Sequence, residues 1–155
     1  MNRKLGWGTL VGAAVTLVTL VGGALGILQA LGPPHDLTGK WTIIDKTEQT
    51  SYSPYQDLQV TYVVTITQEG TDLSGSGYKS AESGHPLFGK AQTPIEIKGK
   101  LKGLRGNSID AAFTEQGAKR PVAGGFNWKL ARDGKWAGTF YSGAADSSGS
   151  STLSR

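Results

Sequence analysis

The chain has 155 residues and a formal net charge of +4, and it contains two histidines and no cysteine. These counts exclude disulfides, thiolate catalysis, zinc–cysteine sites and a histidine-rich metal centre. All twelve acidic residues and fourteen of the sixteen basic ones follow position 34, so the larger part of the chain carries only about +2. This charge does not predict a DNA-binding face.

The first predicted element is an apolar stretch from Leu5 to Leu31, which contains no charged side chain. As an α-helix, its roughly 27 residues would extend about 40 Å, enough to cross a hydrocarbon core of ~30 Å with some tilt. Pro33 and Pro34 end the helix, because proline cannot continue it. The sequence therefore predicts residues 1–34 as a single transmembrane anchor in contact with the lipid bilayer. The alternative is a cleaved secretory signal, whose apolar region is shorter, at about 7 to 15 residues.

Glycines gather on one face of this predicted helix and form two G-x-x-x-G steps. The four residues are Gly8, Gly12, Gly22 and Gly26. A nearly bare helical face lets a second helix approach closely, so the pattern predicts a homo-oligomer formed through the transmembrane helix. The alternative is that glycine is simply common in membrane helices.

The side of the membrane that the rest of the chain faces is left open by the charges near the span. Arg3 and Lys4 precede it and favour an N-terminus inside the cell, with the following domain outside. Lys40 and Lys46 follow closely on the other side and weaken that preference.

Residues 35–155 alternate apolar and polar side chains with the period of β-strands and show no helical period. Strands are predicted over residues 39–46, 57–68, 73–80, 95–102, 109–115, 122–130, 136–140 and 149–155, with residues 81–93 as the longest irregular loop. Eight short antiparallel strands fit a sheet that closes on itself, because closure removes exposed edges.

The predicted fold is therefore all-β: an eight-stranded antiparallel up-and-down barrel, preceded by a single transmembrane helix. A two-sheet sandwich is the alternative. A barrel of this size is filled by side chains or holds one small ligand. Glycine or alanine at several inward positions predicts room for a ligand.

Short motifs resemble known barrel families. Gly39-x-Trp41 and the terminal Arg155 resemble the signature of the calycin barrels (lipocalins, fatty-acid-binding proteins and avidins), in which a late basic side chain packs over that tryptophan. The segments 37–41 and 73–78 also look avidin-like. The resemblance implies a calycin-like barrel and, in one interpretation, an extracytoplasmic, membrane-anchored lipocalin-like or avidin-like ligand binder.

The plan of the whole chain is similar to the membrane-anchored β-barrel effectors of bacterial cyclic-oligonucleotide antiphage (CBASS-type) signalling. The segment 66–68 (Ile-Thr-Gln) closes the second strand, and Gly138-x-Phe140-Tyr141 precedes the last one. That family senses a cyclic nucleotide in the barrel, oligomerises and damages the inner membrane. The resemblance implies a single-pass protein of the bacterial inner membrane that acts in antiviral defence. The family typically carries two membrane helices where this chain has one, and its barrel faces the cytoplasm.

Side chains alternate between the two faces of a strand, and this parity places Glu115 and Arg120 on the inward face, at facing ends of two paired strands. They are predicted to form an ion pair at the rim of the barrel. This pair is either a hairpin-closing salt bridge worth under about 1 kcal/mol or part of a polar mouth, in which Arg120 and the neighbouring Lys119 bind a phosphate or carboxylate.

Four further inward residues are candidates for lining the cavity: Tyr62, Lys79, Phe126 and Trp128. Their aromatic rings would stack a base, and the lysine would meet an anion. For each of them the alternative is a place in the core. Trp41 and Arg155 are predicted to form a structural cation–π contact at the closed end of the barrel.

No catalytic constellation is recognisable in the sequence. Both histidines fall in loops, no G-x-x-x-x-G-K motif occurs, and no paired carboxylates sit on an identifiable scaffold. The sequence predicts a non-enzymatic module, without cofactor or metal, that binds a small anionic ligand. The best candidate ligand is a cyclic nucleotide, and the module would act by clustering its transmembrane helices. An anchored carrier and a plain interaction domain are the alternatives.

Overall fold

Alternating apolar and polar side chains produce the strands that the sequence predicts. The computed structural model describes residues 35–117 and 119–155. The strands are β1 (Gly39–Gln49), β2 (Gln59–Glu69), β3 (Asp72–Glu82), β4 (His85–Pro86), β5 (Pro94–Lys102), β6 (Ser108–Gln116), β7 (Pro121–Leu130), β8 (Trp136–Ser142) and β9 (Ser147–Ser154). Two short 3₁₀ turns, η1 (Ser53–Tyr55) and η2 (Gly89–Ala91), lie in the connections that follow β1 and β4.

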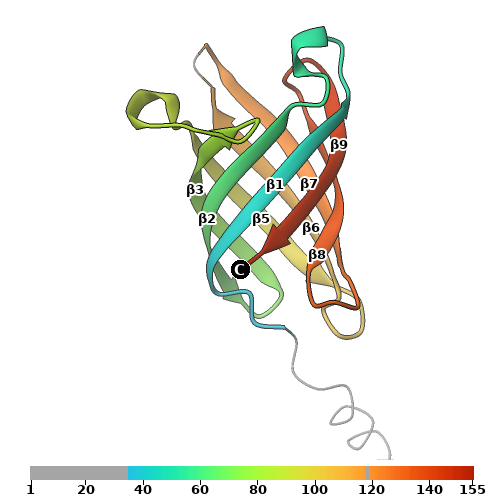
Figure 1. Ribbon diagram of the computed structural model, residues 1–155. Coiled ribbons are helices and arrows are strands. Elements are labelled where there is room, and N and C mark those ends of the chain that lie inside the picture. Colours follow the sequence, from blue (N-terminus) through green and yellow to red (C-terminus); the bar gives the residue numbers. More distant parts are fainter. Residues whose placement is uncertain (1–34, 118) are drawn as a thin grey trace, which may run out of the picture. The chain divides into compact units, whose positions relative to one another are not determined.

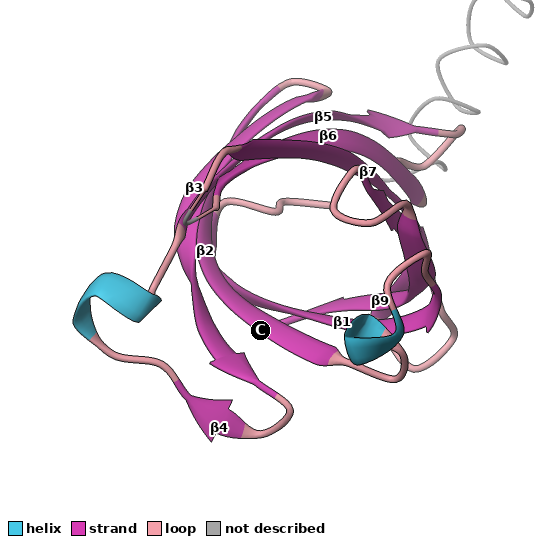
Figure 2. Ribbon diagram, turned by 90° about the horizontal axis from the view of Figure 1, so that it is seen from above, coloured by secondary structure: helices cyan, strands magenta, loops and turns pink. Residues whose placement is uncertain are grey.

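Eight long strands close into a ring, which is seen end-on in Figure 2. Each strand pairs antiparallel with its neighbours, β1 pairs with both β2 and β9, and the pairing of β2 with β3 completes the circle. The two-residue β4 only extends the end of β3. The arrangement confirms the predicted all-β, eight-stranded antiparallel barrel and shows that the sandwich alternative is wrong.

The predicted transmembrane helix and its four glycines lie outside the described residues. Within residues 35–117 and 119–155, no helix is long and apolar enough to cross a membrane.

One end of the barrel, which we call the floor, is filled by large apolar side chains. The floor is the end at which β1 begins and β9 finishes (Figure 1). The side chains that fill it come from all eight long strands and are all buried: Trp41, Ile66, Leu73, Leu101, Ile109, Trp128, Trp136 and Leu153. Burying this much apolar surface supplies the main driving force for folding of the barrel.

The cation–π contact predicted for the floor is present. The Arg155 guanidinium carbon lies 4.8 Å from the centre of the Trp41 ring. The same guanidinium donates hydrogen bonds to the carbonyl oxygens of Asp36 (3.1 Å) and Thr38 (3.3 Å). The Trp41 indole N–H donates to the Leu37 carbonyl oxygen at 2.6 Å. These contacts join the two ends of the described chain at the floor.

The inward glycines shape the wall and do not provide the ligand space predicted from them. A Cβ added at Gly77 would lie 2.0 Å from the Val63 carbonyl oxygen, and one added at Gly138 would lie 1.8 Å from that of Asn127. The backbone of the neighbouring strand therefore passes so close that any side chain would collide with it. The space for a ligand lies elsewhere.

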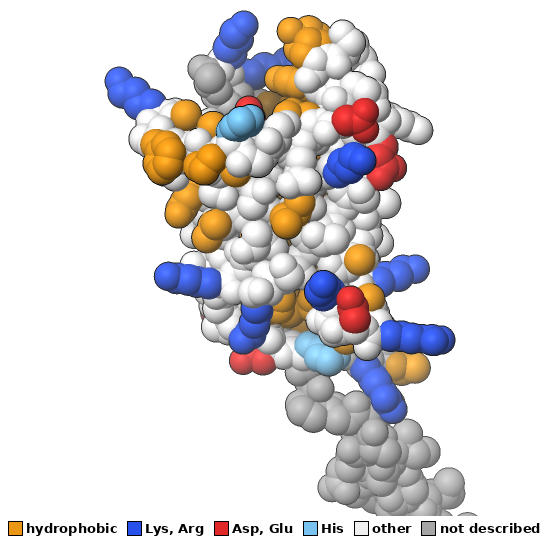
Figure 3. Space-filling view, in the orientation of Figure 1, with side chains coloured by type: hydrophobic (Ala, Val, Ile, Leu, Met, Phe, Trp, Pro, Cys, Tyr) orange, Lys and Arg blue, Asp and Glu red, His pale blue; other side chains and the backbone are white. Residues whose placement is uncertain are grey.

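The outer surface carries charges of both signs. Lys, Arg, Asp and Glu side chains are spread over the visible face and do not collect into one patch (Figure 3). Lys100 pairs with Asp72 at 3.0 Å, and Lys102 pairs with Asp110 on the neighbouring strand. Such exposed pairs contribute little to stability.

Candidate ligand-binding site at the barrel mouth

A cavity of about 330 Å³ opens at the end of the barrel opposite the floor, which we call the mouth. Its apolar wall consists of Leu58, Val60, Phe113, Val122 and Phe140. Its polar wall includes Asp45, Tyr62, Lys79, Glu82, Thr93 and Glu115. Ligand sites in proteins span about 300–1,000 Å³, so this cavity suits a small molecule.

Two larger depressions, of about 630 and 590 Å³, lie on the outer surface of the barrel wall. Exposed side chains form much of their lining, for example Asn127 and Thr139 in one and Lys98 and Lys100 in the other. The mouth cavity is the better candidate site because it contains buried ionisable groups, which are costly to keep unless they have a role.

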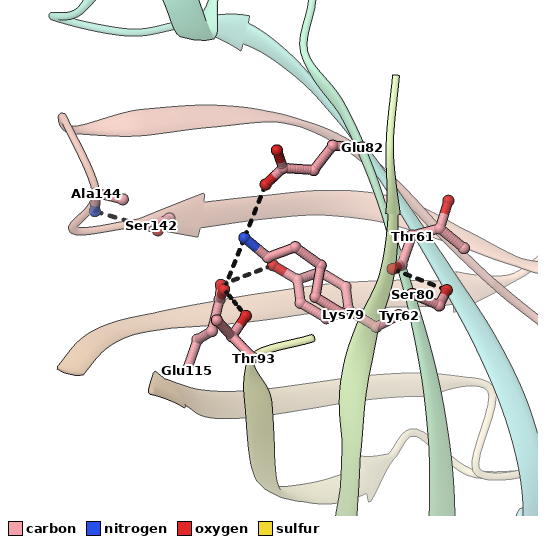
Figure 4. A network of polar contacts seen from close by, with 9 residues as sticks. All are labelled: Thr61, Tyr62, Lys79, Ser80, Glu82, Thr93, Glu115, Ser142 and Ala144. Atoms are coloured by element: carbon pink, nitrogen blue, oxygen red, sulfur yellow. Dashed lines mark hydrogen bonds and ion pairs between the residues drawn. The ribbon is translucent and has the colours of Figure 1, made fainter. Parts of the chain in front are cut away.

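Glu115, near the end of β6, is the centre of a polar network at the mouth (Figure 4). Its Oε1 accepts a hydrogen bond from the Thr93 hydroxyl (2.6 Å) and lies 2.9 Å from the Lys79 ammonium. Its Oε2 accepts a hydrogen bond from the Tyr62 hydroxyl at 2.9 Å. The Lys79 ammonium also lies 2.9 Å from a carboxylate oxygen of Glu82. Three strands and the loop before β5 are thereby tied together.

Burial and pairing fix the charge states within this network. Burial alone would lower the pKa of Lys79, but the hydrogen bonds and charges of Glu115 and Glu82 outweigh it, and the pKa is raised. Burial raises the pKa of Tyr62 well above its ordinary value, and the nearby carboxylates of Glu115 and Asp45 raise it further. Lys79 is therefore a cation at neutral pH, and Tyr62 is a neutral hydrogen-bond donor.

Asp45 is the one member of the polar wall with a buried side-chain atom that lacks a partner. Its side chain is 4% exposed, and its Oδ1 has no hydrogen-bond partner among the described residues. Burial raises the pKa of Asp45 to about 7, a hydrogen bond with Ser151 acts in the opposite direction, and the charge of Glu115 adds to the rise. The carboxyl is thus close to half-ionised at neutral pH, where a nearby group can shift its charge state.

The structure brings together three of the predicted site residues, Tyr62, Lys79 and Glu115, at the mouth cavity. Lys79 and Tyr62 are direct cross-strand partners in the β2–β3 ladder. Parity on β2 and β3 predicted both as inward, and this is confirmed.

The predicted ion pair of Glu115 with Arg120 is wrong, because Glu115 pairs with Lys79. Glu115 lies opposite Val122 in the β6–β7 ladder, and the last pair is Gln116 with Pro121. Arg120 therefore precedes the first paired residue of β7 and lies in the turn. The inward parity assigned to Arg120 does not extend beyond the ladder, and Arg120 and Lys119 are both exposed.

Trp128 does not line the cavity. Its side chain is 1% exposed, its indole N–H donates to the Ser151 hydroxyl at 2.9 Å, and its ring stacks on Phe126 with centroids 4.4 Å apart. Phe126 in turn stacks on Phe113 at 4.7 Å. The core alternative is the one that the structure shows for Trp128 and Phe126.

Three residues of the polar wall, Asp45, Glu82 and Thr93, were not among the predicted site residues. Asp45 carried a usable signal, because it shares the inward parity of Trp41 and Ile43 on the first strand. An acid at such a position is buried, and a buried acid is a candidate for function. Thr93 carried no such signal, because it belongs to an irregular connection whose path depends on long-range packing.

No protein-family model and no curated protein matches the sequence. Among solved structures, a redesigned β-barrel is similar, with a TM-score of 0.54 and 12% sequence identity. The alignment covers 77% of this chain and 90% of the redesigned barrel. At this level of identity the likeness concerns the fold alone, a small closed antiparallel β-barrel.

Proposed function

We propose that this protein is a binding module that takes one small molecule in the mouth of its barrel. The observation that carries the proposal is the polar wall of the mouth cavity, in which a completely paired Glu115 lies near an Asp45 carboxyl whose Oδ1 lacks a partner. Burying such groups is costly, and a barrel without a ligand would be more stable with apolar side chains at these positions.

The sequence adds a proposed mode of action to this binding module. Residues 1–34 would anchor the barrel in a bacterial inner membrane, and ligand binding would act through clustering of the anchors in antiviral defence. The exposed cations at or near the mouth, Lys90, Lys119 and Arg120, favour an anionic ligand such as a cyclic nucleotide. Lys79 argues against an anion, because two carboxylates already neutralise it.

An extracytoplasmic carrier of an apolar ligand is the second candidate function. It is favoured by the five apolar side chains that form one side of the cavity. The orientation of the barrel across the membrane separates the two candidates, and a reporter at the C-terminus that is active on only one side of the membrane measures it.

Filling the cavity is expected to abolish ligand binding without unfolding the barrel. Ala144 lines the mouth from the β8–β9 loop, so Ala144→Trp places an indole in the entrance at a position where the backbone can adjust. Ligands are detected by changes in amide chemical shifts during titration with a library of small amines, alcohols, acids and cyclic oligonucleotides. We expect the shifts to map to the cavity wall in the native protein and to vanish in Ala144→Trp.

The matched control is Ala137→Trp, which adds the same indole on the exposed face of β8. Binding should be unchanged in this variant. Equal binding in the two tryptophan variants, or no binding by any library member to the native protein, would contradict the proposal.

The predicted anchor has a test of its own. If the glycine face packs helix against helix, Gly12→Ile and Gly22→Ile are expected to weaken the oligomer, because a branched side chain prevents close approach. Leu17→Ile lies off that face and should leave the oligomer intact. Cross-linking of the full-length protein in membranes measures the oligomer, and identical behaviour of all three variants would contradict helix association through the glycines.

A further inference from the structure

We infer that the mouth cavity selects a small organic cation, an amine with an apolar body whose ammonium group pairs with Asp45. The inference rests on the proposed function, for which it names the chemical class of the ligand. It differs from the anionic ligand that the sequence predicts.

The first observation is the pairing of the polar groups around the cavity. Glu115 receives three donors, Lys79 contacts two carboxylates, and the Tyr62 hydroxyl donates to Glu115. Among the buried side-chain atoms that the structure describes, only Asp45 Oδ1 has no partner, and Asp45 lines the cavity. In its ionised form the Asp45 carboxylate accepts hydrogen bonds and cannot donate them, so the partner that this form lacks is a donor.

The second observation is the charge of the wall. Its carboxyl groups come from three strands: Asp45 from β1, Glu82 from β3 and Glu115 from β6. Lys79 is the cation within the network, whereas Lys90, Lys119 and Arg120 are exposed at or near the rim. A ligand anion would meet this surplus of carboxyls or would have to break the pairs of Lys79, whereas a ligand cation compensates the surplus.

Among the described residues, no cation pairs with Asp45. Tyr62 on β2 is a neutral phenol that already donates to Glu115, and Glu115 on β6 is an anion. Ser151, which faces Asp45 on β9, accepts the Trp128 N–H. The positive charge of Lys79 on β3 is committed to Glu82 and Glu115.

The apolar wall determines the chemical character of the part of the ligand that carries no charge. Leu58, Val60, Phe113, Val122 and Phe140 offer hydrocarbon surface next to the polar groups. A cavity of about 330 Å³ has room for a ring with a short side chain. Such a ligand buries its ring against the apolar side chains and extends its ammonium group toward Asp45.

Binding of a cation to Asp45 has a defined proton balance. In the free protein at pH 6 the carboxyl is mostly protonated, since its pKa is about 7. The ammonium pairs with the ionised form, so the Asp45 proton leaves to solvent as the ligand enters. Affinity should therefore increase as the pH rises from 5 to 7 and level off above 8.

The test uses sets of probes that share one skeleton and differ in head group. Benzylamine, benzyl alcohol and benzoic acid form the first set, and tryptamine, tryptophol and indole-3-acetic acid form the second. Each is titrated calorimetrically into the full-length protein at pH 7.5. We expect the amine of a set to bind at least about tenfold more tightly than the acid, as for a charged hydrogen bond.

The variant Asp45→Asn should lower the affinity for the amine at least about tenfold and leave the alcohol nearly unchanged. Asp72→Asn, which changes an exposed carboxyl on the outer surface, is the matched control and should bind as the native protein does. A second measurement needs no variant. Titrations of the native protein in two buffers of different ionisation enthalpy should show release of close to one proton at pH 6 and almost none at pH 8.5.

The outcomes separate the inference from the proposed function. If an acid binds as tightly as its matching amine, if Asp45→Asn binds amines normally, or if no proton is released at pH 6, the inference is wrong and the binding module stands. If none of the probes binds, both the inference and the proposed function are wrong.

Discussion

Replacing Asp45 with asparagine is expected to stabilise the protein above neutral pH and to flatten the pH dependence of its unfolding free energy. The folded protein holds the Asp45 proton with a pKa of about 7, against an ordinary value of 3.8. Because the folded state binds this proton more tightly, its contribution to stability is complete below about pH 4 and is lost as the pH rises to 7. The loss amounts to about 4 kcal/mol.

An asparagine cannot ionise and escapes this loss, but it brings an amide whose buried groups lack partners, at a cost of about 1–3 kcal/mol. We therefore expect Asp45→Asn to unfold at higher urea concentration than the native protein at pH 8, with a net gain of about 1–3 kcal/mol. At pH 4 the order should reverse. Urea denaturation at both pH values measures the effect, with Asp72→Asn as a control that should follow the native protein. If the unfolding free energy of Asp45→Asn depends on pH as that of the native protein does, the raised pKa of Asp45 is not the cause and the prediction is wrong.

Glu115→Ala is expected to cause the largest loss of stability of any single change in the polar wall. The variant leaves the Tyr62 hydroxyl and the Thr93 hydroxyl without their acceptor and leaves the partly buried Lys79 with Glu82 alone. Breaking a buried ion pair from one side costs about 3–5 kcal/mol, because the remaining charge stays desolvated. We expect a decrease of that size in the unfolding free energy.

The control for this prediction is the double variant Glu115→Leu with Lys79→Met, which removes both charges and fills the space with apolar side chains. It should be more stable than Glu115→Ala, because the one charge left without its partner, Glu82, has a side chain that is 42% exposed and stays hydrated. Glu96→Ala, on the exposed face of β5, should change the unfolding free energy by less than about 0.5 kcal/mol. A loss below about 1 kcal/mol in Glu115→Ala would show that the network contributes little.

The strands were predictable because buried and exposed side chains alternate along each of them with a period of two. On β2, for example, Tyr62, Val64 and Ile66 are buried and the residues between them are more exposed. The pairing of Lys79 with Glu115 was not predictable, because it depends on the β3–β5 and β5–β6 registers together, and no local pattern fixes two registers in sequence. The error at Arg120 came from extending a strand period into a turn, where side chains no longer alternate between two faces.

The candidate site was partly visible in the sequence for the same reason. Inward parity correctly placed Tyr62, Lys79 and Glu115, and it placed Asp45 as well, although that residue was not singled out. Parity does not give height along the barrel axis, which is why Trp128 was expected at the mouth and lies in the floor. The anchor and its glycine face stay predictions, because they fall outside the described residues.

Because its floor is packed with side chains, the barrel is open at one end only and does not form a channel. Tryptophan and leucine side chains fill its lower end, and the Arg155 guanidinium lies over Trp41 from outside. A molecule that enters must leave by the same opening, so its residence time depends on the loops around that opening. Solutes do not cross through the interior, and any leak of a membrane caused by this protein would have to form outside the barrel.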